Sequence, residues 1–174
     1  YGDSITAGFK QLESAGVINM GVGGDKTIEL IGRLSSVTIL KPDKLFILVG
    51  INDFTTNKGK WGDHLKIPFD KTYDILLETI KLSIPETQVY VLGVLPVNVS
   101  SIVLDQEVFD FNHEITELNQ FIKALAESKG FQYVDITDAF KDENGYLKAS
   151  FTPDGTHLND DGYNVFYNQI IRYI

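Results

Sequence analysis

Two short motifs at opposite ends of the chain carry side chains that could do chemistry together. Near the start, a serine follows an acidic residue in the run Tyr1-Gly2-Asp3-Ser4-Ile5-Thr6-Ala7-Gly8. Near the end stands the run Asp154-Gly155-Thr156-His157. A hydroxyl, an imidazole and a carboxylate are the nucleophile, base and orienting group of a serine-hydrolase triad. Taken singly, each motif is better explained as an ordinary turn or helix N-cap.

A glycine-rich run between these motifs, Gly21-Val22-Gly23-Gly24-Asp25-Lys26-Thr27, suggests a loop that binds negative charge. It does not match the dinucleotide-binding pattern, because Lys26 stands where the third glycine belongs. It does not match a P-loop either, because no glycine precedes the Lys-Thr pair. A glycine at a helix entrance can present its backbone N–H to a developing oxyanion. A tight turn with positive φ angles is the simpler alternative.

A second polar turn, Gly50-Ile51-Asn52-Asp53, directly follows an apolar run at 44–49. The Asn52 amide is a neutral donor that could also point at an oxyanion. An Asx-turn or a helix cap is the alternative for an isolated site of this kind. Asp53, by its position next to Asn52, is a candidate for ordering that turn.

The chain has only three histidines, and only His157 lies in a motif. His64 lies in a polar segment and is expected in a loop, while His113 is expected in solvent at the start of a helix. No H-E-x-x-H pattern occurs, so the sequence gives little support for a metal site. The absence of cysteine excludes disulfides and thiolate chemistry.

Length and charge limit the classes of protein and partner. The chain has 174 residues, which fits a single domain spanning 1–174. Its formal net charge of -9 argues against nucleic acid and against an anionic membrane surface as partners. Its apolar runs are too short to span a bilayer. The oligomeric state and the compartment, cytoplasmic or exported, are left open.

Apolar strand-like runs alternate with longer amphipathic stretches along the chain. Strands apolar on both faces and separated by helices predict a parallel sheet covered on both sides. In such sheets, sites form beyond the carboxyl ends of the strands, where the polar loops above are expected. The expected strands cover 17–20, 44–49, 89–94 and 131–135, and the expected helices cover 26–34, 69–82, 114–129 and 161–173.

The four motifs in this order resemble the GDSL, or SGNH, hydrolase family. The resemblance spans nearly the whole chain and implies a three-layer α/β/α sandwich of the flavodoxin-like type with a central parallel sheet. It implies Ser4 as nucleophile, His157 as general base and Asp154 as the residue orienting it. It further implies an oxyanion hole made by the Ser4 and Gly24 N–H groups and the Asn52 amide, with no metal or cofactor. Ile5 replaces the Leu of the family's first motif.

Within the family, the runs Lys41-Pro42-Asp43-Lys44-Leu45-Phe46 and Leu95-Pro96-Val97-Asn98 look most like bacterial relatives of platelet-activating-factor acetylhydrolase catalytic subunits. Thr6 stands where the nucleophile elbow of α/β-hydrolases needs its second glycine, so the chain does not match that fold family. The family fold also leads us to expect a first strand before Tyr1, lying between residues 17–20 and 44–49.

The expected function is a serine esterase that cleaves short acyl esters, acetyl above all, of a small molecule with a polar alcohol. A thioesterase or lysophospholipase for longer chains is the alternative, and a non-catalytic binding module is a more distant one. The apolar segment between Pro96 and His113 is expected either to form a wall facing the substrate or to pack as a loop on the sheet edge. It could also form a lid that accepts longer chains.

Overall fold

A parallel sheet lies at the centre of the computed structural model, which describes residues 1–55, 68–98, 102–104 and 107–174. Its strands are β1 (Lys44–Ile47), β2 (Gln88–Leu92) and β5 (Gln132–Val134), in the order β1-β2-β5. All pair in parallel, with Phe46 opposite Tyr90 and Tyr90 opposite Gln132. Because the strands are parallel, the loops leaving them gather at one edge, where the polar motifs lie.

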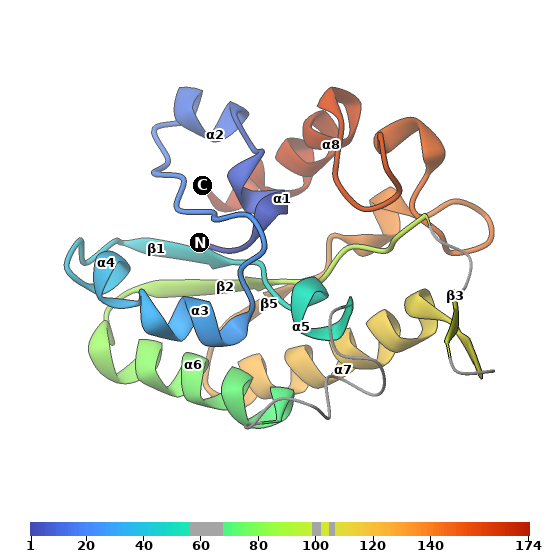
Figure 1. Cartoon of the computed structure of the whole chain (residues 1–174). Coiled ribbons are helices and arrows are strands. Elements are labelled where there is room, and N and C mark those ends of the chain that lie inside the picture. The colour runs from blue at the N-terminus through green and yellow to red at the C-terminus, as the bar shows by residue number, and fades with distance from the viewer. Residues whose placement is uncertain (56–67, 99–101, 105–106) are drawn as a thin grey trace.

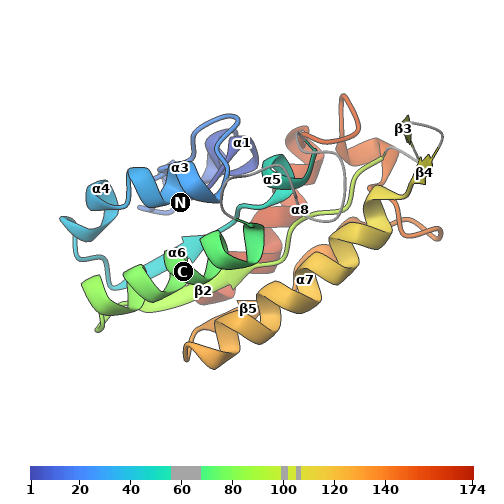
Figure 2. The same cartoon turned by 60° about the horizontal axis from the view of Figure 1, so that its bottom comes forward.

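Helices cover both faces of this sheet (Figure 1). The helices α3 (Thr27–Gly32), α6 (Phe69–Ser83) and α7 (Phe111–Ser128) lie on one face, as the turned view in Figure 2 also shows. On the other face lie α1 (Ser4–Ala7) and α8 (Asp160–Ile170). The α/β/α sandwich expected from the sequence is therefore confirmed. The shorter helices are α2 (Gln11–Ser14), α4 (Ser35–Thr38), α5 (Ile51–Thr55), η1 (Thr137–Phe140), η2 (Ala149–Phe151) and η3 (Ile171–Tyr173).

Each face of the sheet has its own apolar core. The larger core includes Leu76, Leu77 and Ile80 of α6, all fully buried. The smaller one includes Phe9, Phe140 and Phe166, and the Phe166 ring contacts the other two rings. Burial of such apolar side chains is the main favourable contribution to folding, at about 25 cal/mol per Å².

Helix α7 begins three residues earlier and ends one residue earlier than the expected 114–129. At its start, the Asp110 side chain accepts hydrogen bonds from the Asn112 and His113 backbone N–H groups, so that Asp110 is the N-cap. At its end, Gly130 has φ +82°, and Phe131 N–H donates to Ala126 O. This is the left-handed glycine cap that the sequence predicts.

Residues 17–20 do not form the expected strand. The apolar residues in this range suggest burial, yet Ile18 is 69% exposed. Asn19 instead bonds the backbone with its side chain, donating to Thr6 O and accepting from Gly21 N–H at 2.9 Å. Such side-chain bonds compete with a strand ladder. Only Gly21 pairs, in an isolated parallel bridge to Gly2, which also bridges Leu48.

Two asparagines of α7 hold the extended segment that follows β2. The Asn119 amide donates to Val94 O and accepts from Val94 N–H, at 2.9 and 2.8 Å. The Asn112 amide does the same with Val97, at 2.9 Å for both bonds. Because residues seven apart lie on one helix face, the two amides act as a neighbouring strand would. The segment is thereby directed toward the loop that carries His157.

The segment between Pro96 and His113 is not a plain loop. It contains an antiparallel hairpin of β3 (Ile102–Leu104) and β4 (Glu107–Phe109). The two ends of the segment are anchored in the core, since Val97 and Phe111 are 4% and 7% exposed. Positions 99–101 and 105–106 of this segment lie outside the described residues.

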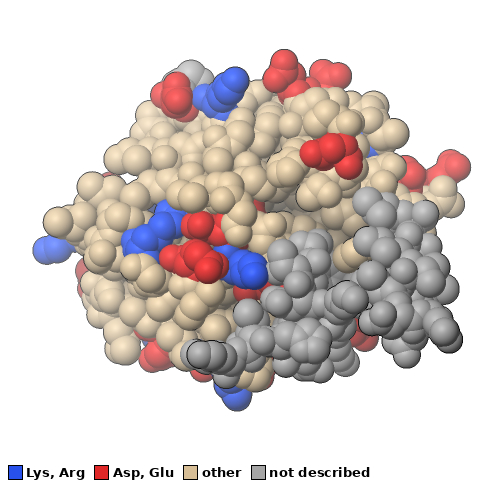
Figure 3. Space-filling view, viewed as in Figure 1, with Lys and Arg blue, Asp and Glu red and all other residues tan. Residues whose placement is uncertain are grey.

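Charged side chains of both signs share the molecular surface. On the face seen in Figure 3, basic and acidic side chains lie beside one another, with further acidic ones scattered over the uncharged surface. In the described part of the chain, no helix combines the length and the apolar character needed to cross a bilayer.

Candidate active site

Ser4 is the first residue of α1, directly behind its N-cap. The Asp3 carboxylate accepts a hydrogen bond from Ile5 N–H at 3.0 Å. Gly2 fits here because a Cβ on it would lie 2.2 Å from Leu48 O, a distance no side chain tolerates. At a helix start the first N–H groups have no partner within the helix. The Ser4 N–H accordingly donates to no described residue.

The loop before α8 presents the imidazole of His157. The Asp154 Oδ1 atom accepts from Thr156 N–H and His157 N–H at 3.0 and 2.8 Å, which fixes the turn. Gly155, at φ +88°, closes this turn, and its carbonyl accepts from Asn98 N–H at 2.7 Å. The segment after β2 therefore holds this loop at the same sheet edge as Ser4.

Ser4, His157 and Asp154 form a continuous hydrogen-bonded chain. The distance between His157 Nε2 and Ser4 Oγ is 3.1 Å, and that between His157 Nδ1 and Asp154 Oδ2 is 2.6 Å. With the proton on Nδ1 donated to the carboxylate, Nε2 can accept the serine proton. These three residues, 153 positions apart at the extremes, are thus brought together in the arrangement of a nucleophile, a base and its orienting carboxylate.

Gly24 lies in a turn beside Ser4. Asp25 N–H donates to Val22 O, and Gly24 has φ +82°, so a residue with a side chain would be strained here. A Cβ on Gly23 would lie 4.0 Å from Ser4 Cβ, which places the turn against the serine. The Gly24 N–H donates to no described residue. It is therefore available to a ligand at Ser4.

Asn52 and Asp53, in α5, connect to this glycine turn. The Asn52 amide donates to Asp25 O at 2.9 Å. Asp53 accepts from Thr27 N–H at 3.0 Å and from Thr27 Oγ1 at 3.1 Å. Asp53 therefore holds the start of α3 relative to α5, a wider role than the local ordering of the Asn52 turn suggested by adjacency.

Three carboxyl groups around the site have shifted pKa values. The hydrogen bond from His157, with help from Thr156 N–H, lowers the pKa of Asp154 to about 2, so that this carboxylate is ionised at neutral pH. Burial raises the pKa of Asp3 to about 7 and that of Asp53 to about 6. Both are 1% exposed. Desolvation outweighs the hydrogen bonds they accept.

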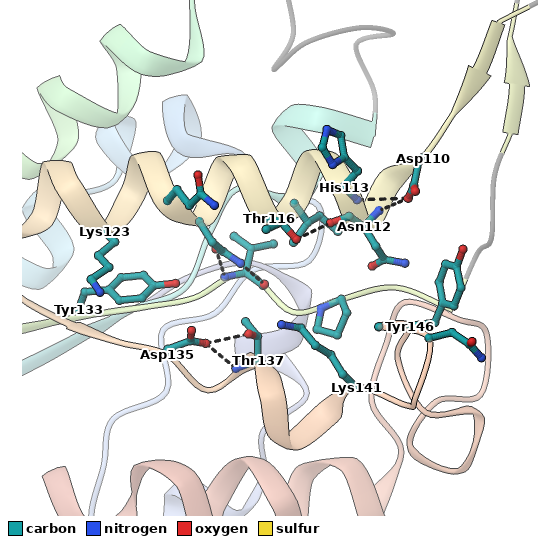
Figure 4. A pocket seen from close by; sticks show the side chains of 17 residues that line it. Asp110, Asn112, His113, Thr116, Lys123, Tyr133, Asp135, Thr137, Lys141 and Tyr146 are labelled. Carbon is teal, nitrogen blue, oxygen red and sulfur yellow. Dashed lines mark hydrogen bonds between the residues drawn. The ribbon is translucent and has the colours of Figure 1, made fainter.

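The two larger cavities are not lined by Ser4, Asp154 or His157. One, of about 560 Å³, is lined by polar side chains of α7, of β5 and of the segment from η1 onward, among them Lys123, Tyr133 and Lys141 (Figure 4). Its lining includes none of Ser4, Asp154 and His157. A much smaller cavity of about 10 Å³ is lined by the neighbours of Ser4, Asn52 and His157, namely Asp3, Ile5, Ile51 and Thr156 among others.

His113 does not join the site. His113 is 68% exposed, with its Nε2 atom 3.8 Å from Glu117 Oε1. His64 lies outside the described residues. Within the described ranges, no group of three or more His, Cys, Asp or Glu side chains is placed to hold a metal ion.

Sequence reasoning gave no role to Arg33, although it contacts three segments of the site. Its guanidinium donates to the Asp25 carboxylate, to Met20 O and to Gly2 O. It is one of only two arginines in the chain, but this rarity does not distinguish it from Arg172. No motif contained it, and its partners become neighbours only in the fold.

The order of the motifs and this geometry can be compared with known proteins. A model of the GDSL-like lipase/acylhydrolase family matches residues 1–165. This chain belongs to that family. Membership in this family places the chain in the class of carboxylic ester hydrolases. The resemblance expected from the four sequence motifs is therefore confirmed.

Individual relatives are distant in sequence. N-acylneuraminate cytidylyltransferase from Escherichia coli O18:K1:H7 is 26% identical over 167 residues, which are 95% of this chain and 36% of that protein. The chain therefore spans well under half the length of this curated relative.

Solved structures show the same fold. A Streptococcus pneumoniae protein named for platelet activating factor is 25% identical with a TM-score of 0.79, covering 99% of this chain and 80% of that one. The acetyl xylan esterase AlAXEase is 22% identical with a TM-score of 0.78, covering 100% and 97%. The first of these agrees with the expected likeness to platelet-activating-factor relatives.

Proposed function

We propose that the protein is a serine esterase that cleaves short acyl esters, acetyl above all, through an acyl-enzyme. The hydrogen-bonded chain from Ser4 Oγ through His157 to Asp154 is the observation that carries this proposal. Ser4 is the nucleophile, His157 the general base and Asp154 the orienting carboxylate. No cofactor is needed for this chemistry.

In the first step, Ser4 Oγ attacks the ester carbonyl carbon while His157 Nε2 takes the hydroxyl proton. Asp154, held ionised by its low pKa, stabilises the imidazolium that forms. When the bond between the acyl carbon and the alcohol oxygen breaks, His157 returns the proton to the alcohol. A water molecule then repeats the sequence on the acyl-enzyme and releases the acid and Ser4.

The charge that develops on the carbonyl oxygen meets donors from three segments. These are the Ser4 N–H, the Gly24 N–H and the Asn52 amide. The first two have no acceptor among the described residues, which supports their role as oxyanion donors. Such preorganised donors act mainly on the transition state and each contributes about 10²- to 10³-fold in kcat.

The preference for a short acyl group is supported by the space beside Ser4. The cavity between the neighbours of Ser4, Asn52 and His157 measures about 10 Å³, which is room for about one water molecule. A fatty chain would have to lie elsewhere on the described surface. An acetyl group can be held at Ser4 without a large enclosed pocket, which supports acetyl as the acyl group.

The base and its carboxylate are about half exposed, which supports a polar alcohol such as a carbohydrate as the leaving group. The His157 and Asp154 side chains are 48% and 50% exposed. The fold is compatible with such a substrate, because an acetyl xylan esterase shares it. The thioesterase or lysophospholipase alternative would use the same machinery on longer chains.

Turnover of p-nitrophenyl esters of increasing chain length tests the proposal. We expect kcat/KM for acetate to exceed that for octanoate at least about tenfold, or about 1.4 kcal/mol in transition-state binding. Acetylated sugars are then compared with acetylated simple alcohols. A profile that rises steadily toward long chains would favour the longer-chain alternative, and no hydrolysis at any length would contradict an esterase.

A further inference from the structure

Arg33 connects three segments that the site requires. It follows α3 as its C-cap, and its side chain is 24% exposed. Its Nε atom donates to Asp25 Oδ2 at 2.6 Å, Nη1 to Met20 O at 2.9 Å and Nη2 to Gly2 O at 2.9 Å. Its guanidinium also lies 4.4 Å from the centre of the Tyr1 ring. One planar group thus binds three separate stretches of backbone and side chain.

Each of these contacts is made to a segment that carries, or bonds, one of the oxyanion donors. Gly2 is two residues before Ser4, so its position affects the Ser4 N–H. Met20 and Asp25 flank the glycine turn, so they affect the Gly24 N–H. The Asp25 carbonyl accepts the bond from the Asn52 amide, so Asp25 also affects the third donor.

We propose that Arg33 is a positioning residue that sets the distances between the three oxyanion donors. This inference rests on the proposed esterase function and adds a residue that none of the family motifs contains. Arg33 touches no substrate and acts through Gly2, Met20 and Asp25. It is the only described side chain that bonds both the segment before Ser4 and the carboxylate beside Gly24.

The role requires an arginine for a geometric reason. Guanidinium N–H groups lie in a rigid planar fork, whereas a lysine ammonium is a single point of charge on a flexible stem. A lysine at position 33 could keep the charge facing Asp25, which is 8% exposed, but could not hold both carbonyls as well. The donors would then be free to move apart, and a misplacement of about 1 Å can cost about 100-fold in rate.

The effect should appear in kcat rather than in KM. Oxyanion hydrogen bonds are realised in the transition state, while the ground-state ester binds largely without them. Arg33→Lys should therefore lower kcat about 10- to 100-fold and change KM by less than about threefold. A role in stability alone would lower only the fraction of folded, active molecules.

The experiment measures kcat per active site. Sites are counted by complete labelling with a fluorophosphonate, and acetyl-ester kinetics are measured for the wild type, Arg33→Lys and the control Arg172→Lys. Arg172 is the chain's other arginine, and it is exposed, with its guanidinium bonded to the neighbouring Tyr173 hydroxyl. The control should match the wild type.

Free guanidinium ion, added at millimolar concentration to Arg33→Ala, should restore part of kcat per site.

The outcomes separate this proposal from the function on which it rests. Wild-type kcat per site in Arg33→Lys, with loss only in the number of sites, would overturn the positioning role. A wild type that neither turns over esters nor labels would instead contradict the proposed function. If Arg33→Lys does not fold, Asp25→Asn is measured in the same way, because it weakens the Arg33 pair and keeps an acceptor of similar shape. We expect at least a threefold fall in kcat per site, and an unchanged value overturns the proposal.

Discussion

Replacing Asp3 with asparagine should remove much of the pH dependence of the protein's stability. Burial raises the pKa of Asp3 from 3.8 to about 7. The folded state then holds this proton more tightly than the unfolded state does, so stability falls as pH rises from about 4 to about 7. A rise of about three units corresponds to at most about 4 kcal/mol, at 1.36 kcal/mol per unit. Asparagine also caps helices well, so α1 should keep its N-cap.

The assay is urea unfolding followed by circular dichroism at pH 4.5 and pH 8. The free energy of unfolding of the wild type should fall from pH 4.5 to pH 8. The corresponding fall in Asp3→Asn should be smaller by about 2 to 4 kcal/mol. Asp53, whose burial raises its pKa to about 6, is common to both proteins and largely cancels in the comparison. Asp138→Asn is the control, because that side chain is 89% exposed. Parallel pH dependence in wild type and Asp3→Asn would refute the reasoning.

Three further substitutions separate catalysis from stability. Asn52→Ala should lower kcat about 10²- to 10³-fold with little change in KM, and a change confined to KM would place Asn52 in substrate binding. Asp154→Asn should lower kcat at least about 10²-fold, because the amide favours the wrong imidazole tautomer of His157, with a melting temperature near that of the wild type. Tyr73→Phe should leave the free energy of unfolding unchanged or raise it by up to about 1 kcal/mol, since the buried Tyr73 hydroxyl has no hydrogen-bond partner among the described residues. A loss above 1 kcal/mol in urea unfolding would show that it has one.

The regular elements of the larger core could be predicted because their patterns are strong and local. Helix α6 carries a clear apolar stripe, and its observed bounds differ from the expected 69–82 by one residue. The glycine cap of α7 followed from a single residue, Gly130. The strand predicted at residues 17–20 was wrong. Three apolar residues in four suggest a buried strand, whereas Asn19 bonds the backbone with its own side chain.

The site could be predicted only in part, because some of its contacts join residues that are far apart in the sequence and lie in no motif. Ser4, Gly24, Asn52, Asp154 and His157 each stand in a motif, so their types and order pointed to one chemistry. Arg33 and the asparagine pair of α7 have no such motif. Their contacts cross many residues, as between Arg33 and Gly2, 31 positions apart. Only the fold brings these partners together.

The central claim is that Ser4 is the nucleophile, and intact-mass spectrometry after fluorophosphonate treatment tests it most directly. We predict one covalent adduct on the wild type, located on Ser4 by peptide mapping, together with loss of esterase activity in step with labelling. The Ser4→Ala variant, folded by circular dichroism, should take no label and lose at least about three orders of magnitude in kcat. A wild type without an adduct, an adduct on another residue, or near-native turnover by Ser4→Ala would contradict the account.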